Sequence, residues 1–289
     1  MNQNVKYLII VLFLLLIIIP PQVFGEDEHK TVIVGRDETF DYISIQQAIW
    51  DANENDTIFI TNGTYYETLT IPCSLKLTGE SRNETIIDGN GQDIVIMLNA
   101  SNIIIENLTI RNSGNVFPNA GITIKTTGNT ITNNRLIENY YGIVLLYPTA
   151  YNLISNNFIA DNNQCGIYFS GAKYNMLKGN FVDSQPFNGF GLYDFSDYNK
   201  IINNTLSHNQ YCGVNIRDSF YNTVTSNTFI ENRVGLHVPP PECQTTKEKN
   251  MFYGNTVDIE EERDLVIYTL ITAVILMILG FFIYKRRIM

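Results

Sequence analysis

Residues 152–180 read NLISNNFIADNNQCGIYFSGAKYNMLKGN and contain the unit that much of the chain repeats. Two asparagines five residues apart, Asn152 and Asn157, each precede a short apolar stretch, and the same pair returns at Asn175 and Asn180. The pairs are Asn102/Asn107, Asn129/Asn134, Asn152/Asn157, Asn175/Asn180, Asn199/Asn204, Asn222/Asn227 and Asn250/Asn255. Their first members lie 27, 23, 23, 24, 23 and 28 residues apart. A repeat of this length, made of apolar runs and turns, is typical of a solenoid.

A glycine followed by an apolar residue opens each repeat. These glycines are Gly121, Gly142, Gly166, Gly191, Gly213 and Gly235. Apolar side chains then alternate with polar ones, which predicts three short strands in each coil. Asparagine tolerates the left-handed backbone conformation at turns, and stacked amides hydrogen-bond along the axis. We therefore predict an all-β parallel β-helix in which the asparagines form a structural ladder and are neither ligands nor catalytic groups.

The segment before the repeats predicts a cap. Residues 43–52 carry apolar side chains at helical spacing, which indicates one amphipathic helix. A solenoid needs a cover over the apolar end of its core, and this helix is placed to provide it. We assign residues 26–57 to an N-terminal cap and residues 58–259 to the β-helix.

Two apolar segments bound the chain. Residues 1–25 have the basic start, the apolar run and the small final residue of a secretory signal cleaved after Gly25, with a retained N-terminal anchor as the alternative. Residues 265–284 carry no charge and have the length of a membrane-spanning helix. An acidic linker, 260–264, precedes this segment, and a basic tail, 285–289, follows it on the expected cytoplasmic side. We therefore expect a single-pass protein of the cell membrane with its repeats outside the cytoplasm.

The part expected to be exported is strongly acidic. Residues 26–264 hold 29 acidic residues against 15 basic ones, a formal net charge of −14. Such a surface repels nucleic acids and anionic membranes, so we expect no nucleic-acid partner.

The soft and imidazole side chains are scattered through the chain. The histidines are His29, His208 and His237, and no His-rich or Met-rich tract occurs. A copper site needs such ligands close together, so we expect no metal and no cofactor. Cys165 and Cys212 share one predicted column two coils apart, roughly 9.6 Å at about 4.8 Å per coil. A disulfide needs Cα atoms within about 7 Å, so we expect these two cysteines not to pair.

Several stretches resemble one family. They are Ser44-Ile-Gln-Gln-Ala-Ile, Asp56-Thr-Ile-Phe-Ile, Gly63-Thr-Tyr-Tyr-Glu-Thr-Leu, Leu75-Lys-Leu-Thr-Gly-Glu and Thr85-Ile-Ile-Asp-Gly-Asn-Gly. Together with the repeats, residues 31–259 resemble the NosD-like family of right-handed parallel β-helix proteins in the pectin-lyase-like superfold. The resemblance implies a carbohydrate-binding or sugar-hydrolysing type of domain. It also implies a surface protein of archaeal type, or an accessory factor in copper-enzyme maturation.

Charged residues in the later repeats are the candidates for catalysis. A glycoside hydrolase needs two carboxylates facing one bond, about 5 to 10 Å apart. The candidates are Asp194, Asp197, Arg217, Asp218 and His208. Asp194 stands in a predicted apolar column, where an acid is costly unless it is paired, and Arg217 is its candidate partner. A structural ion pair or a local shift of register is the alternative interpretation. The Asn-Thr-Asp, Asp-Asp and Gly-His-Gly pattern of polygalacturonases does not occur.

Two columns of polar and aromatic residues are the candidates for binding. Four residues share the third predicted position of successive coils and should point outward: Tyr168, Tyr193, Asn215 and His237. Aromatic faces beside amides suit sugar rings, and packing is the alternative role. A second column precedes the first asparagine of each pair: Tyr151, Tyr174, Tyr198 and Tyr221. We expect these rings to stack and stabilise a turn, with binding as the alternative.

These patterns favour a membrane-anchored extracellular β-helix protein that binds carbohydrate or contributes to the cell envelope without catalysis. Its expected partner is an extracellular glycan or an envelope component. One alternative is a polysaccharide hydrolase or lyase, and another is a NosD-like factor in copper-enzyme maturation.

Overall fold

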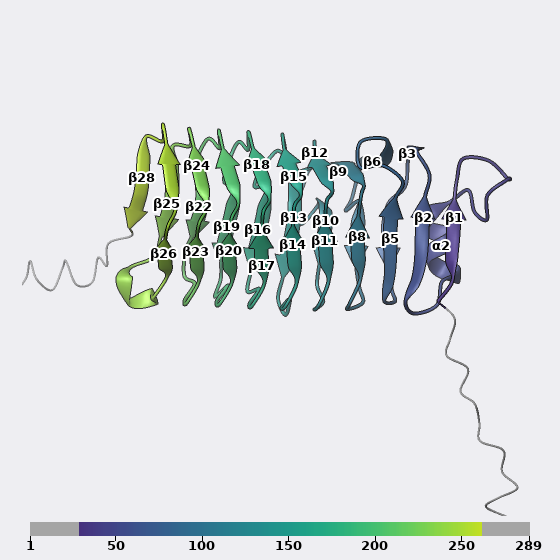
Figure 1. Cartoon of the computed structure of the whole chain (residues 1–289), viewed down its shortest axis with the longest axis horizontal. Helices are drawn as coiled ribbons and strands as arrows, with labels where there is room; N and C mark the ends of the chain where they lie inside the picture. The colour runs from purple at the N-terminus through teal and green to yellow at the C-terminus, as the bar shows by residue number, and fades with distance from the viewer. Residues whose placement is uncertain (1–28, 262–289) are drawn as a thin grey trace, which may run out of the picture. The chain divides into compact units, whose positions relative to one another are not determined.

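The protein is built as a stack of coils made from short parallel strands (Figure 1). The computed structural model describes residues 29–261. Each full coil contributes one strand to each of three sheets, and every strand pairs with its equivalents in the neighbouring coils. The predicted all-β parallel β-helix is therefore confirmed.

The three sheets run along the axis of the stack. The first sheet comprises β1 Thr31–Val34, β2 Asp56–Ile60, β5 Leu75–Gly79, β8 Ile104–Glu106, β11 Thr130–Thr132, β14 Leu153–Ser155, β17 Met176–Lys178, β20 Lys200–Ile202, β23 Thr223–Thr225 and β26 Thr246–Glu248. The second comprises β3 Gly63–Tyr65, β6 Thr85–Gln92, β9 Thr109–Ser113, β12 Arg135–Ile137, β15 Phe158–Ala160, β18 Phe181–Asp183, β21 Thr205–Ser207, β24 Thr228–Ile230 and β27 Met251–Tyr253. The third comprises β4 Leu69–Ile71, β7 Ile96–Leu98, β10 Ala120–Ile124, β13 Tyr141–Leu146, β16 Ile167–Ser170, β19 Phe190–Tyr193, β22 Cys212–Ile216, β25 Val234–Val238 and β28 Val257–Glu261.

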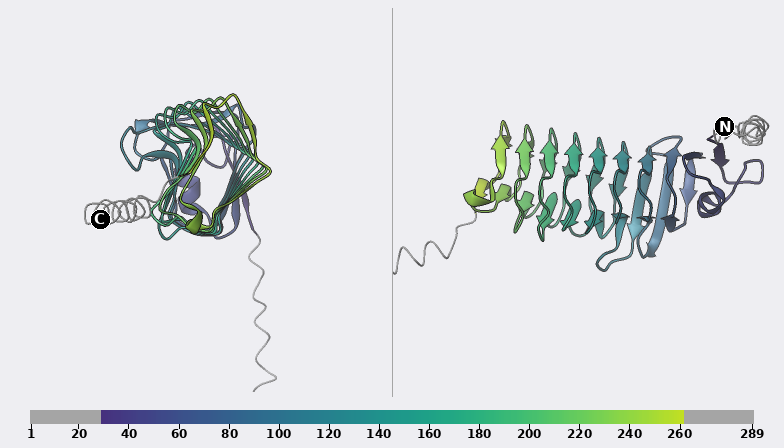
Figure 2. Two further views of the ribbon diagram at one scale, coloured as in Figure 1. Left: turned by 90° about the vertical axis from the view of Figure 1, so that its left-hand side faces the viewer. Right: turned by 90° about the horizontal axis from the view of Figure 1, so that it is seen from below.

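The core is a continuous column of apolar side chains inside the coils. Equivalent positions in successive strands face inward, as in the series Ile131, Ile154, Leu177, Ile201 and Val224, all fully buried. Viewed along the axis, the coils superimpose around this core (Figure 2). The alternation of apolar and polar residues produces this arrangement, because successive side chains of a strand point to opposite faces.

Three ladders of buried amides hold the coils together at the turns. The backbone N–H and the Nδ2 of Asn152 both donate to Asn175 Oδ1, at 3.0 and 2.9 Å. The first ladder contains Asn129, Asn152, Asn175, Asn199 and Asn222. The second contains Asn134, Asn157, Asn180, Asn204, Asn227 and Asn250. The third contains Asn139, Asn162, Gln185, Asn209, Asn232 and Asn255.

Two of the predicted asparagine pairs are placed differently. The backbone N–H groups that donate to Asn129 and Asn134 belong to Ile103 and Leu108, so Asn102 and Asn107 lie one residue before the ladder positions. Both have a positive φ and form the left-handed turns. At the other end, Asn250 and Asn255 belong to the second and third ladders rather than the first and second. This difference explains the spacing of 28 residues, which is one coil plus the interval of five between ladders.

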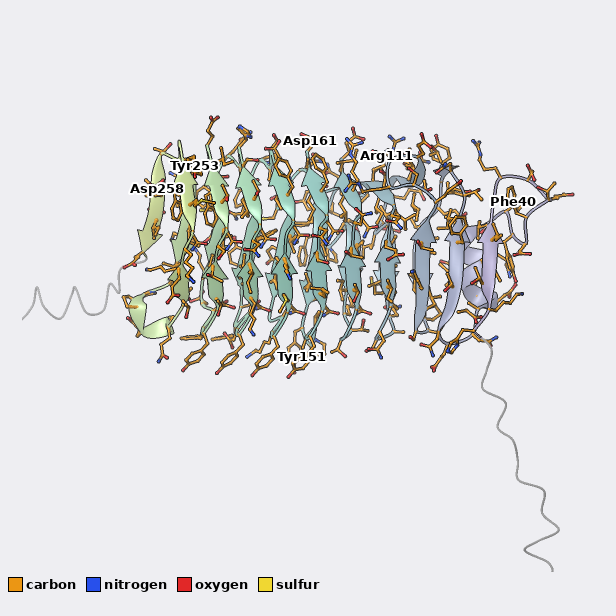
Figure 3. All side chains as sticks on the ribbon, viewed as in Figure 1. Phe40, Arg111, Tyr151, Asp161, Tyr253 and Asp258 are labelled. Atoms are coloured by element: carbon orange, nitrogen blue, oxygen red, sulfur yellow. The ribbon has the colours of Figure 1, made fainter. Side chains whose placement is uncertain are left out.

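The left-handed turn before the first ladder carries the second predicted tyrosine column. Tyr151, Tyr174, Tyr198 and Tyr221 have φ values of 57–58°. Their rings stack at centroid distances of 5.3, 4.9 and 4.9 Å, as the structural interpretation predicts. Tyr151 lies at one long edge of the β-helix, and Asp161 lies at the opposite long edge (Figure 3).

The predicted N-terminal helix is present as α2, Ile45–Asp51, which begins after the N-cap Ser44. Its apolar face is buried in the same core as the strands. A role for residues 26–57 as a cap stays a prediction. Among residues 29–261, no helix is long and apolar enough to cross a membrane. The predicted signal segment 1–25 and the predicted membrane helix 265–284 lie outside the described residues.

Candidate functional site

A groove of about 410 Å³ lies on the outer face of the third sheet. It follows the strands β13, β16, β19 and β22 and the segments beside them. Its lining consists of Tyr141, Gln164, Cys165, Tyr168, Phe187, Tyr193, Asp194, Tyr211, Asn215 and Arg217. A cavity of this size, with aromatic walls and a few polar groups, is typical of a small-molecule site.

Three tyrosines from successive coils form the aromatic floor. The ring centroids of Tyr141 and Tyr168 lie 5.2 Å apart, and those of Tyr168 and Tyr193 lie 5.3 Å apart. The three tyrosines hold different register positions, since Tyr168 pairs with Val144 and Gly191, and Tyr193 pairs with Ser170. The row arises because adjacent parallel strands lie about 4.8 Å apart, within reach of neighbouring aromatic rings. Tyr168 and Tyr193 are only partly buried, so their rings are accessible from the groove.

The register of β19 differs from the predicted one by two residues. Gly191, not Tyr193, pairs with Tyr168 and Asn215, and Tyr193 pairs with Ser170. The ring of Tyr193 folds back over Gly191, where an added Cβ would lie 2.6 Å from that ring. Tyr193 therefore occupies the space that the missing side chain of Gly191 leaves in the outward column.

The same shift places Asp194 outside the apolar column. Leu192, not Asp194, occupies the apolar column between Phe169 and Ile216. Asp194 is exposed, and its Oδ2 accepts a 2.7 Å hydrogen bond from Ser170 Oγ. The alternative of a local shift of register is therefore correct. The predicted pairing of Asp194 with Arg217 does not occur among the ion pairs of residues 29–261, although both side chains line the groove.

The polar centre of the groove is the hydroxyl of Tyr193. It accepts hydrogen bonds from Asn188 Nδ2 at 2.9 Å and from Asn215 Nδ2 at 3.3 Å. Asn215 is 2% exposed, and within residues 29–261 its Oδ1 has no hydrogen-bond partner. A buried carbonyl oxygen without a partner carries a desolvation cost that a bound donor would remove.

Burial keeps the titratable groups of the floor neutral. It raises the pKa of the Tyr193 hydroxyl above its ordinary value, and it raises the pKa of the Cys165 thiol to about 11. Cys165 and Cys212 are both thiols and lie two coils apart, with Asn188 between them in the same column. A neutral, buried thiol is a poor nucleophile, so Cys165 serves the groove as an apolar side chain.

The other candidate catalytic residues lie elsewhere. Asp197 is buried, with Oδ2 2.6 Å from Lys173 Nζ and Oδ1 accepting from Phe220 N, which is a structural ion pair. Asp218 is exposed in a left-handed turn and does not line the groove. His208 lies in another turn column, with Nδ1 2.7 Å from Asp183 Oδ1 and Nε2 3.3 Å from Glu231 Oε2.

Three of the four predicted binding residues line the groove, and one does not. His237 pairs with Asn215 in the register of β25 but is 5% exposed and lies outside the lining. Sequence reasoning missed Gln164, Phe187 and Tyr211 as lining residues. They lie in the short segments between the third ladder and the third sheet, which no strand pattern marks. Within residues 29–261, no group of three or more His, Cys, Asp or Glu side chains is placed to hold a metal ion.

A family model described as right handed beta helix region matches residues 93–257. The chain belongs to this right-handed β-helix family. Its handedness, predicted from the resemblance, is therefore confirmed, and the solved structures that resemble it lie in the same pectin-lyase-like superfold. No curated protein matches the chain.

Several solved structures share the fold of this β-helix protein. The A-module of the mannuronan C-5 epimerase AlgE6 from Azotobacter vinelandii is 17% identical with a TM-score of 0.54, and the match covers 75% of this chain and 74% of that one. The pectate lyase Pel9A is 14% identical with a TM-score of 0.54, over 83% and 80% of the two chains. The catalytic domain of a GH87 α-1,3-glucanase in complex with nigerose is 16% identical with a TM-score of 0.61, over 82% of this chain but 46% of that one. These structural neighbours act on polysaccharides, and at such identities the likeness shows the fold alone.

Proposed function

We propose that the groove on the third sheet binds a neutral glycan and that the protein acts as a binding module of the cell surface. The observation that carries this proposal is the row of Tyr141, Tyr168 and Tyr193 beside the buried, unpaired Oδ1 of Asn215 within residues 29–261. Aromatic faces stack against the apolar faces of sugar rings, and the carbonyl oxygen accepts a hydrogen bond from a sugar hydroxyl.

The hydrogen-bonding capacity of the floor matches that of a hydroxyl group. The hydroxyl of Tyr193 already accepts from two amides, so its own hydrogen is available to a bound acceptor. Asn215 Oδ1 offers an acceptor in the same wall. A sugar hydroxyl both donates and accepts, and it satisfies both groups where an apolar ligand satisfies neither.

The charge of the protein favours a neutral ligand. The lining holds one carboxylate, Asp194, and one guanidinium, Arg217, so it has no excess of positive charge. Residues 26–264 carry a net charge of −14, which repels a polyanionic chain. The groove therefore differs from a site built for an acidic polysaccharide such as mannuronan or pectate.

A polysaccharide-cleaving enzyme is the second candidate function. The structural neighbours favour it, because they include a pectate lyase and an α-1,3-glucanase. Hydrolysis needs two carboxylates across one bond, and the groove lining supplies Asp194 alone. This composition favours binding over cleavage.

The proposal is tested by screening the full-length protein against neutral and acidic glycans on an array. We expect binding to neutral glycans, and we expect Tyr168→Ala combined with Tyr193→Ala to abolish it. The matched control combines Tyr174→Ala with Tyr221→Ala, which removes two rings of the turn column outside the groove. The proposal is overturned if the wild-type protein binds no glycan, or if the variant with Tyr168→Ala and Tyr193→Ala still binds. Release of new reducing ends from a bound polysaccharide establishes the enzyme instead.

A further inference from the structure

The outer face of the third sheet is covered at one end of the groove and open beside it. Thr123 and Val144 occupy outward positions of β10 and β13, in register with Tyr168, yet both are fully buried. Ala120, Tyr141, Val144 and Cys165 form an apolar cluster on this face that is separate from the core. Something outside the sheet therefore covers the face before the groove begins.

An insertion, residues 114–119, provides this cover. It joins Ser113, at the third ladder position, to Ala120 in the third sheet, whereas the next coil makes the same connection with Tyr140 alone. The Phe117 ring packs edge-on against Tyr141 and Tyr168, at centroid distances of 6.1 and 5.8 Å. The segment projects beyond the outline of the other coils in Figure 2.

Hydrogen bonds fix the insertion against the coils beside it. Gly114 N donates to Asp93 O at 2.7 Å, and Thr123 Oγ1 donates to Pro118 O at 3.3 Å. Asn163 Nδ2 donates to Asn115 Oδ1 at 3.1 Å, so the insertion extends along the axis as far as the segment that carries Gln164. Contacts on both sides make it a fixed wall.

The groove is also bounded at its other end. Its lining stops at Asn215 and Arg217, and the next residue of the outward column, His237, is buried and outside the lining. A polysaccharide chain that lay along the axis with internal sugar units in the groove would have to pass over Phe117.

We propose that the groove recognises the end of a glycan chain and that the insertion 114–119, through Phe117, excludes internal segments. This inference rests on the proposed glycan binding. A terminal sugar unit fits a groove that is bounded along the axis, since its outer hydroxyls meet the wall at Phe117 while the rest of the chain leaves the groove toward solvent.

The test compares one polysaccharide before and after its chains are shortened. The polysaccharide bound most strongly on the array is used intact and after partial acid hydrolysis, at equal mass, with full-length protein. Recognition of chain ends predicts that the amount of protein bound per gram rises in proportion to the number of chain ends. Equal binding per gram overturns end recognition and leaves glycan binding intact, whereas the absence of binding to any glycan on the array overturns the proposed function as well.

A variant of the wall gives the second readout. Phe117→Ala opens the groove at its closed end, and we expect its binding to the intact polysaccharide to rise to the level that the wild type reaches on the hydrolysate. Phe181→Ala is the matched control, because Phe181 is a partly exposed ring of the second sheet stacked on Phe158. Thermal unfolding of both variants checks that they fold. A folded Phe117→Ala variant that binds intact and hydrolysed material in the wild-type ratio contradicts the role of the wall.

Discussion

At the scale of single residues, one glycine shapes the floor of the groove. Gly191 leaves space in the outward column, and the ring of Tyr193 fills that space from two residues further along the chain. The sequence alone did not reveal this, because Gly189 and Gly191 both precede an apolar pattern. The structure places Gly189 in the repeat position, where an added Cβ would lie 2.6 Å from Gly213 O. The intervals from Gly166 to Gly189 and on to Gly213, 23 and 24 residues, were the signal that favoured this register.

His208 is the residue whose charge should make stability depend on pH. Its hydrogen bond with Asp183 raises the pKa of His208, with a further contribution from Glu231. Burial acts to raise the pKa of Asp183, but hydrogen bonds from Ser207 and His208 outweigh burial and lower this pKa. Because the pKa of His208 is raised on folding, the ion pair stabilises fully below about pH 6.5 for as long as Asp183 stays ionised. The contribution is lost as pH rises through the folded-state pKa of His208.

We therefore expect His208→Gln to lower the free energy of unfolding more at about pH 6 than at about pH 9. Urea unfolding of the wild type and the variant at both pH values measures the difference. Glu231→Gln is the control: it removes the more distant partner, 3.3 Å away, and should give a smaller effect in the same direction. A destabilisation by His208→Gln that is the same at both pH values contradicts the role of its charge.

At the scale of elements, the amide ladders join strands that are short on their own. Asn180 Oδ1 accepts from the backbone and side-chain nitrogens of Asn157, and Asn180 Nδ2 donates to Ile154 O at 2.9 Å. Removing this side chain leaves several buried groups of the turn without partners. Each such group costs about 1 to 3 kcal/mol, so the loss exceeds that of an ordinary surface substitution.

We expect Asn180→Ala to lower the free energy of unfolding by about 3 kcal/mol or more. Asn156→Gly is the matched control, because Asn156 is an exposed turn residue with a φ of 54° that glycine adopts freely. Its cost should stay below about 1 kcal/mol. Chemical denaturation of both variants measures the two values. Similar values for the two substitutions contradict a ladder that stabilises through its buried amides.

The elements were largely predictable from the sequence, because a strand period and a coil period are both visible in it. Apart from the register of β19, the departures occur where the side chain at a ladder position is not an asparagine. Ile103 and Leu108 begin the first two ladders with backbone N–H groups alone, so the nearby Asn102 and Asn107 resembled members. Gln185 replaces an asparagine in the third ladder, where its Oε1 accepts from Asn162 N and its own N–H donates to Asn209 Oδ1. The asparagine pattern of the sequence does not mark this position. The groove was less predictable, because segments between the strands contribute a large part of its lining.

At the scale of the whole solenoid, residues 31–261, the coils should differ in stability along the axis. A solenoid is stabilised by contacts between neighbouring coils, so an end coil has only one neighbour. The five residues of β22 are all buried, whereas the five residues of β28 are all exposed. The strands β26, β27 and β28 are also the last strands of their sheets. At the N-terminal end, α2 buries its apolar face in the core.

Hydrogen exchange followed by mass spectrometry tests both ends in one experiment. We expect the amides of residues 246–261 to exchange at least about ten-fold faster than those of residues 205–230, because the last coil opens without the rest. Residues 31–60 form the matched comparison, since they are also terminal but carry α2. Slower exchange there than at 246–261 is the outcome expected if the helix acts as a cap. Equal exchange rates at the two ends contradict a capping role for α2. Uniform protection of all coils contradicts a stability that depends on contacts between neighbouring coils.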